Sequence, residues 1–241
     1  MTDAAAMAVD SKRVFVHRLF STIAPRYDCF NRLASLNLDR GWRRRAVAVS
    51  ELRAGMDVLD VCTGTGDLAL LCADRLQGRG RVIGLDFNDD MLRPASRKAQ
   101  HRRASVQWMR GDALALPFRS GTFDRAFIGF STRNLSDLRA GIQEMHRVLK
   151  PRGRLVILET GRPENRLVLA GYLLFLGTAA RLLGLLLTGR LWPFTYLARS
   201  VQAFLRPSEF VALMDRCGFQ ASSTPLSMGL AMLYLADKPS G

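Results

Sequence analysis

Short apolar runs alternate with helical patterns through the middle of the chain. The runs are four to six residues long and lie at 56–61, 81–85, 106–109, 125–130 and 155–158. The helical patterns lie between them, near 67–77, 89–103 and 136–149. This alternation is typical of βαβ units, whose strands form one parallel sheet. The central part is therefore predicted to be a parallel sheet covered by helices.

The flanking regions have different patterns. Residues 12–50 are predicted to be helical with a break at Pro25, and Lys150–Gly153 is predicted to be a turn before the fifth strand. Near the other end, 207–217 predicts a helix stopped by Gly218, and 219–225 and 229–236 predict two closing strands. The expected organisation is a flexible tail (1–14) and one domain (15–241), which comprises a helical cap (15–50), a cofactor-binding core (51–160), an apolar helical insertion (161–206) and a closing helix and hairpin (207–241).

Length and composition restrict the class of protein. The chain of 241 residues is 48% apolar and 23% charged, which suits one domain with a sizeable core. Its 35 Lys and Arg exceed its 21 Asp and Glu, and this surplus of +14 favours nucleic acid, anionic lipid or an acidic partner. The four scattered cysteines exclude a zinc ribbon or a disulfide scaffold. We read neither a metal site nor a secretory signal and expect a cytoplasmic protein.

One apolar segment complicates that expectation. Leu167–Gly189 is long enough to cross a bilayer and carries a single charge, Arg181. Because a central arginine is costly in a membrane span, we favour a buried or interface helix within the domain. A helix on the membrane surface is the second interpretation, and a true span is the third. Basic residues beside the segment would suit anionic headgroups on the inner face of the cytoplasmic membrane.

A glycine-rich turn follows the first strand of the core. Gly64 and Gly66 permit a tight turn and close approach of a ligand, in the spacing Gly-x-Gly-x-x-Ala. Asp60 lies on the strand, and Asp67 lies where a pyrophosphate would need the free helix N-terminus. Two carboxylates there repel a phosphate and suit a ligand with an ammonium and a sulfonium. The turn is therefore predicted to bind S-adenosylmethionine.

Acidic residues also end the next two strands. Asp86 is placed to accept hydrogen bonds from both ribose hydroxyls. Asp112 and the backbone of Ala113 are placed to hold the adenine edge. A lone Asp at such a position is more often a helix cap or a turn residue, but its recurrence on successive βα units favours a ligand site.

Several further motifs indicate a family resemblance. Gly111–Phe118 (GDALALPF) and Arg147–Gly153 (RVLKPRG) are general to class I methyltransferases. The more specific motifs are Phe20–Asp28 (FSTIAPRYD), Asn31 with Ser35, Trp42-Arg43, Phe130–Asn134 (FSTRN) with Asp137, and Tyr196–Ser200 (YLARS). With these motifs the chain resembles the ubiquinone/menaquinone biosynthesis C-methyltransferases, over about residues 15–238.

The resemblance implies an α/β fold, a Rossmann-like doubly wound seven-stranded sheet whose last strand is antiparallel. It also implies C-methylation of a prenylated quinol, with 2-demethylmenaquinol preferred to the ubiquinone precursor. Thr65, Asp86, Asp112 and Ala113 match donor contacts of the family, and Gly129 stands where a serine contact is usual. Other departures face the expected acceptor side: Asp39, Arg199 and Glu159–Gly161. A relative acting on a different phenolic acceptor stays open.

Methylation of a ring carbon requires a neighbouring hydroxyl to lose its proton. Arg133 and Asn134, just after the fourth strand, are predicted to steady the phenolate and to orient a water. Their alternative role is turn chemistry and a surface charge. Family position suggests that Tyr27 closes over the donor together with Asp28. No histidine is identified as the base.

Three other functions remain as alternatives. The first is an O- or N-methyltransferase of another aromatic small molecule, and the second is an RNA methyltransferase, suggested by the basic surplus. The third is a catalytically silent membrane-bound scaffold. Against RNA, no aromatic platform for stacking bases is evident, so we expect no nucleic-acid partner. A homo-oligomer is left open.

Overall fold

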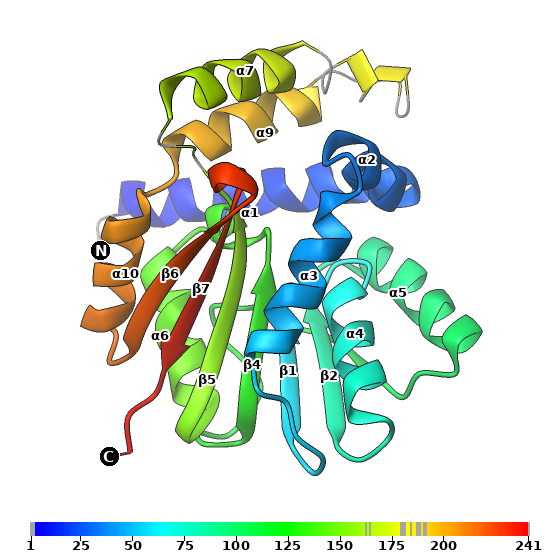
Figure 1. Cartoon of the computed structure of the whole chain (residues 1–241), viewed down its shortest axis with the longest axis vertical. Coiled ribbons are helices and arrows are strands. Elements are labelled where there is room, and N and C mark those ends of the chain that lie inside the picture. The colour runs from blue at the N-terminus through cyan, green and yellow to red at the C-terminus, as the bar shows by residue number, and fades with distance from the viewer. Residues whose placement is uncertain are drawn as a thin grey trace.

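A seven-stranded sheet forms the centre of the molecule (Figure 1). The computed structural model describes residues 3–161, 163, 165–178, 182–183, 185–186, 189 and 192–240. The strands are β1 (Asp57–Val61), β2 (Arg81–Asp86), β3 (Gln107–Arg110), β4 (Phe123–Gly129), β5 (Leu149–Thr160), β6 (Gln220–Leu226) and β7 (Ala231–Asp237). Their order is β3-β2-β1-β4-β5-β7-β6, and β7 pairs antiparallel with both of its neighbours. The predicted doubly wound sheet with an antiparallel last strand is confirmed.

Helices cover both faces of this sheet and extend beyond its carboxyl edge. They are α1 (Asp3–Ile23), α2 (Tyr27–Ala34), α3 (Leu38–Val49), α4 (Asp67–Leu76), α5 (Asp89–Arg102), α6 (Leu138–Val148), α7 (Arg166–Gly177), α9 (Trp192–Ala203) and α10 (Pro207–Arg216), with short 3₁₀ turns η1 (Ala24–Arg26), η2 (Thr132–Asn134) and η3 (Ser227–Gly229). Side chains of α3 and α4 pack in the core on one face, and those of α6 and α10 pack in the core on the other. The sheet is therefore buried on both sides, as its apolar strands require.

The helical patterns of the sequence place the elements within a few residues. The break predicted at Pro25 is η1, between α1 and α2. The prediction of a turn at Lys150–Gly153 before the fifth strand is corrected. Strand pairing already begins at Leu149, which lies opposite Phe123. A register shift between Phe123 and Arg125 accommodates the extra residues of β5.

The N-terminal tail expected over 1–14 is also corrected, because α1 begins at Asp3. Figure 1 shows α1 crossing above the carboxyl ends of the strands. Its last expected tail residues are fastened there: Lys12 Nζ donates to the carbonyl oxygen of Leu135 at 2.6 Å, and the Arg13 guanidinium lies 3.0 Å from the Asp112 carboxylate. These contacts join residues far apart in sequence, so the local pattern does not reveal them.

The apolar insertion forms α7 and α9, which pack against each other above α1 and α2 (Figure 1). Within the described residues, no helix is both long enough and apolar enough to span a bilayer. The sequence analysis used Arg181 to disfavour a membrane span over 167–189. This residue lies outside the described residues.

Candidate active site

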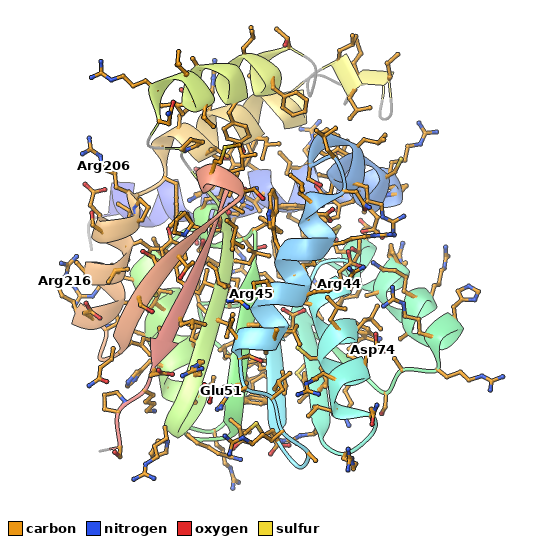
Figure 2. All side chains as sticks on the ribbon, in the orientation of Figure 1. Arg44, Arg45, Glu51, Asp74, Arg206 and Arg216 are labelled. Atoms are coloured by element: carbon orange, nitrogen blue, oxygen red, sulfur yellow. The ribbon has the colours of Figure 1, made fainter. Side chains whose placement is uncertain are left out.

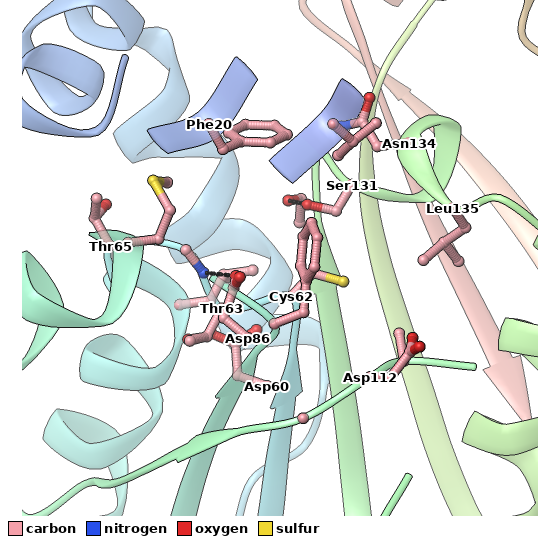
Figure 3. A pocket seen from close by; sticks show the side chains of 18 of the residues that line it. Phe20, Asp60, Cys62, Thr63, Thr65, Asp86, Asp112, Ser131, Asn134 and Leu135 are labelled. Atoms are coloured by element: carbon pink, nitrogen blue, oxygen red, sulfur yellow. Dashed lines mark hydrogen bonds between the residues drawn. The ribbon is translucent and has the colours of Figure 1, made fainter. Parts of the chain in front are cut away.

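Two adjoining cavities open at the carboxyl edge of the sheet. The first lies over the ends of β1 to β4 and beneath α1 and α2, and Figure 3 shows its lining. The second is larger and mostly apolar, and it lies between the helical cap and the insertion. Four side chains line both cavities: Phe20, Tyr27, Arg43 and Asn134.

The glycine turn shapes the floor of the first cavity. Gly64 and Gly66 have φ angles of +56° and +82°, a region that disfavours side chains. Gly64 lines the cavity, whereas Gly66 packs away from it. A Cβ on Gly66 would lie 2.5 Å from the ring of Trp108, so this glycine lets the turn fit against β3. The structure thus gives Gly66 a packing role beside the turn, and its predicted contact with the cofactor stays a prediction.

Asp60 and Asp86 are buried side by side beneath the turn (Figure 3). Oδ2 of Asp60 accepts hydrogen bonds from Thr63 Oγ1 at 2.5 Å and from Ala69 N at 3.0 Å. Its other oxygen, Oδ1, is buried and has no partner among the described residues. Burial raises the pKa of Asp60 to about 7, although both hydrogen bonds oppose the shift.

Asp86 is held by the backbone on both of its oxygens. It accepts hydrogen bonds from Gly64 N at 2.8 Å and from Asn88 N at 3.0 Å, which fixes the carboxylate at the end of β2. Burial raises its pKa to about 6. Each oxygen retains a lone pair, so the carboxylate can still accept a hydrogen bond from a ligand hydroxyl.

Asp112 and Ala113 line the far side of the same cavity. Asp112 Oδ1 accepts from Leu114 N at 3.0 Å, and Arg13 of α1 pairs with its other oxygen. Arg13 also lines the cavity, and the sequence analysis missed it because it fell in the expected tail. Its position three turns into an amphipathic helix was the available signal.

Thr65 connects the glycine turn to the helical cap. Its hydroxyl donates to Asp28 Oδ1 at 2.6 Å, and Lys98 Nζ bridges Asp28 at 2.9 Å and Asp67 at 2.5 Å. The positive charge of Lys98 helps to lower the pKa of Asp67, against the effect of burial. These contacts fasten the cap to the glycine turn and to α4 beside the first cavity.

Gly129 lines the cavity without offering a side chain. A Cβ at this position would lie 2.7 Å from Leu68 Cδ1, so a serine would require Leu68 to move. The hydroxyl of Ser131, two residues further on, lines the same cavity and donates to the carbonyl oxygen of Gly129 at 3.2 Å. Ser131 therefore brings a hydroxyl to the region, and the sequence analysis did not single it out.

The residues present fit S-adenosylmethionine. The buried, unpartnered Oδ1 of Asp60 requires a hydrogen-bond donor, and a ligand ammonium or its bound water supplies one. The carboxylates of Asp60, Asp86 and Asp112 give the lining an excess of acceptors, which disfavours a pyrophosphate.

Of the predicted catalytic residues, Tyr27 and Asn134 lie at the junction of the cavities, and Arg133 lines the second cavity. The Arg133 guanidinium pairs with Glu159, which is fully buried at the end of β5. Nε of Arg133 is buried with no partner in the described part of the chain. Asn134 Oδ1 accepts a hydrogen bond from Tyr196 Oη at 3.0 Å. Burial raises the pKa of Tyr27, which keeps its hydroxyl neutral.

Arg43 is a further cation at the junction, and the sequence analysis missed its role. It is 7% exposed, pairs with Asp39 one helical turn earlier, and lies with its guanidinium carbon 5.2 Å from the centre of the Phe130 ring. Its neighbours Arg44 and Arg45, in contrast, are exposed (Figure 2). The spacing of Asp39 and Arg43, four residues apart on a helix, was the signal for a buried pair.

The departures noted on the acceptor side have structural counterparts. Asp39 is the buried partner of Arg43, and Glu159 is the buried partner of Arg133. Thr160 lines the second cavity, whereas Arg199 is exposed. The two carboxylates therefore hold the two cations of the second cavity in place.

Comparison with known proteins gives consistent results. The model of the ubiE/COQ5 methyltransferase family matches residues 6–238. A demethylmenaquinone methyltransferase of Thermus thermophilus is 42% identical over 92% of this chain and 100% of its own, and one of Deinococcus radiodurans is 40% identical over 92% of each chain. Among solved structures, a SAM-dependent methyltransferase from Thermotoga maritima superposes with a TM-score of 0.63 at 19% identity, over 92% of this chain and 99% of its own. That structure supports the fold.

Proposed function

The chain belongs to the ubiE/COQ5 methyltransferase family, and we propose that it transfers a methyl group from S-adenosylmethionine to a ring carbon of a prenylated quinol, preferring 2-demethylmenaquinol. The preference for this acceptor is supported by the names of the two bacterial relatives described above.

One observation carries the proposal: a cavity lined by carboxylates and suited to the donor adjoins a more apolar cavity suited to a prenylated ring. Phe20, Tyr27, Arg43 and Asn134 belong to both linings, so the methyl group would be transferred between these side chains. Methyl transfer is an in-line displacement, and holding the two reactants on either side of a narrow junction supplies much of the rate.

The side chains at this junction suit an acceptor that becomes an oxyanion. Bound S-adenosylmethionine supplies an electrophilic methyl group on a sulfonium. Arg43 and the unpartnered Nε of Arg133 are cationic donors able to stabilise the ring oxygen once its proton has left. Asn134, fixed by Tyr196, is positioned to orient the oxygen or a water beside it.

The carboxylates behind the two arginines keep these cations in place. Glu159 also accepts hydrogen bonds from Thr132 Oγ1 at 2.5 Å and from the backbone of Thr160 at 2.8 Å, so it cannot easily turn into the cavity. The neutral hydroxyl of Tyr27 closes the junction from the side of the cap. We therefore assign proton removal to water ordered at the junction and not to a carboxylate of the described lining.

The proposal is tested by offering radiolabelled methyl donor with three acceptors in parallel. These are reduced demethylmenaquinone, a prenylated benzoquinol and bulk RNA. We expect label on the naphthoquinol ring carbon, located by mass spectrometry of the product. Label on a hydroxyl oxygen would favour the O-methyltransferase alternative, and label only in RNA would favour the nucleic-acid alternative; either result contradicts the proposal.

A further inference from the structure

Helix α7 is apolar on both of its sides. Val168, Tyr172 and Phe175 face the second cavity and line it. Outside that lining on the same helix, Leu167 is 83% exposed and Leu174 is 66% exposed. A helix that is hydrophobic all round is normally covered all round, and no described residue buries these two leucines.

A second exposed apolar element lies at the turn between α2 and α3. Leu33, Leu36 and Leu38 are 49%, 80% and 41% exposed. Leu36 has a φ angle of +50°, a backbone conformation that is unfavourable for a leucine. This conformation ends α2, and at 80% exposure Leu36 buries little apolar surface within the chain, so its side chain is accessible to a partner.

The second cavity opens between these two elements. Leu36 and Leu38 belong to its lining although they are exposed, so the cavity reaches the surface at their turn. Val168 and Phe175 of α7 belong to the same lining. Figure 1 shows α2 and α7 at one end of the molecule, beyond the carboxyl edge of the sheet. We call the exposed leucines around this opening (Leu33, Leu36, Leu38, Leu167 and Leu174) the leucine rim.

The charges beside the leucine rim are mainly positive. Residues 162–208 contain six arginines and one acidic residue, Glu164, and residues 29–38 contain Arg32 and no Asp or Glu. Arg32, Arg40 and Arg166 are exposed. Asp39, which interrupts the second stretch, is buried against Arg43 and presents no charge to the surface. Exposed leucines flanked by arginines match the two layers of an anionic bilayer, its acyl chains and its headgroups.

We propose that the leucine rim docks on an anionic lipid bilayer and inserts Leu36, Leu167 and Leu174 among the acyl chains. In this arrangement the opening of the second cavity faces the membrane, and a prenylated acceptor enters it without crossing water. The use as an acceptor entrance rests on the proposed function, whereas the docking itself does not.

The same charges disfavour a second copy of the chain as the partner. In a two-fold contact each rim would face an identical rim, so a surplus of arginines would lie against an equal surplus of arginines. The described side chains of the rim offer no opposite charge for such a contact. An anionic surface, in contrast, is attracted by each of the arginines beside the rim.

The test is sedimentation of the full chain with phosphatidylglycerol–phosphatidylcholine vesicles, compared with pure phosphatidylcholine vesicles. We expect binding to the anionic vesicles that weakens with salt. The double variant Leu167→Ser, Leu174→Ser is expected to lower the vesicle partition coefficient at least about tenfold, since it removes two of the inserted side chains. Leu36→Ser is expected to lower it separately. Met109→Ser, which removes an apolar side chain 37% exposed on the edge strand β3, is the matched control and is expected to bind normally.

Two further measurements make the result unambiguous. Affinity for S-adenosylmethionine is expected to be equal in all variants, which shows that they are folded. Leu167→Ser, Leu174→Ser is expected to methylate a short-chain soluble acceptor normally and a vesicle-embedded acceptor poorly. Equal binding of wild type to neutral and anionic vesicles would overturn the proposal, as would normal vesicle binding of the double variant. If light scattering detects a dimer of the wild type and only a monomer of the double variant, the leucine rim would be an interface between two copies of the chain and not a membrane surface. If no quinol is methylated but the vesicle results hold, the proposed function fails and the docking stands.

Discussion

The two adjoining cavities are built in different ways. In the donor cavity, Asp60, Asp86 and Asp112 each accept a hydrogen bond from a backbone N–H at the end of a strand. In the acceptor cavity, the lining consists mainly of side chains from the cap, the η2 turn, α7 and α9. The first is fixed by the sheet itself, and the second by the packing of helices around it.

Because the two cavities are built differently, we expect one to control donor affinity and the other to control turnover. These carboxylates are held by backbone amides of the turns after the strands and of α4, so the donor cavity can stay constant while the acceptor cavity varies. The acceptor cavity, in contrast, contains two arginines whose positions depend on buried carboxylates, Asp39 and Glu159. Substitutions in the two cavities should therefore affect donor affinity and turnover separately.

The largest expected effect is on the donor side, in Asp86→Ala. This change removes the carboxylate that anchors the glycine turn and the acceptor for the ribose hydroxyls. Charge-assisted hydrogen bonds contribute about 1.5–3 kcal/mol each, so the loss of two weakens donor affinity by about 1000-fold. Calorimetry with S-adenosylmethionine measures it. Asp89→Ala, at an exposed residue paired with Arg110, is the control and is expected to bind normally. Donor affinity within threefold of wild type in Asp86→Ala would contradict the assignment.

On the acceptor side, Arg133→Met is expected to leave donor affinity nearly unchanged and to lower turnover about 100-fold, the usual cost of losing one oxyanion donor. It also leaves Glu159 buried without its ion pair, which costs about 3–5 kcal/mol of unfolding free energy.

A second substitution distinguishes these two effects. Arg133→Met combined with Glu159→Gln should recover much of the melting temperature, because the uncompensated charge is gone, while turnover stays low. Thermal melts and single-turnover rates measure the two quantities. Recovery of turnover together with stability would mean that Arg133 acts only through folding.

The smallest predicted effects are the changes of stability and of donor affinity with pH, which concern the donor cavity alone. The pKa of Asp60 is raised to about 7 from an ordinary value near 4, so the folded protein holds this proton more tightly than the unfolded chain. The contribution of protonated Asp60 to stability is therefore fully present below about pH 4 and is lost as pH rises through about 7.

Donor affinity should change in the opposite direction. A cation beside Asp60 favours its ionised form, and the ionised fraction rises about tenfold between pH 6 and pH 8. We expect affinity for S-adenosylmethionine to rise about tenfold over that interval, with release of a proton visible in buffers of different ionisation enthalpy. Asp60→Asn should remove most of this dependence, and Asp74→Asn, at an exposed site on α4, should not. If proton release on donor binding persisted in Asp60→Asn, a group other than Asp60 would be its source.

The donor cavity could be predicted from the sequence to a large extent. Asp60, Asp86 and Asp112 follow strands whose alternation with helices fixes their place at one edge of the sheet. Backbone geometry then determines what each carboxylate contacts. The turn role predicted for Gly66 agrees with its φ angle of +82°, but its packing against Trp108 could not be foreseen, because Trp108 comes from β3, 42 positions later in the chain.

The acceptor cavity could be predicted only in part. Arg133 and Asn134 were found because they follow a strand, whereas Arg13 and Arg43 lie on helices whose rotation is set by packing. A helix such as α7, apolar on every side, has no periodicity that reveals which side faces a cavity. Because the segment 167–189 is apolar almost throughout, its sequence left three interpretations open: a buried or interface helix, a helix on the membrane surface and a membrane span.

The bridge made by Lys98 has a kinetic consequence. It joins Asp28 of the cap to Asp67 of α4, and Tyr27, next to Asp28, is a wall of both cavities. If cofactor exchange opens this bridge, it also displaces a wall of the proposed quinol cavity. Cofactor exchange and quinol binding would then compete for one segment of chain, and we expect a cycle in which the donor binds before the quinol and its demethylated product leaves last.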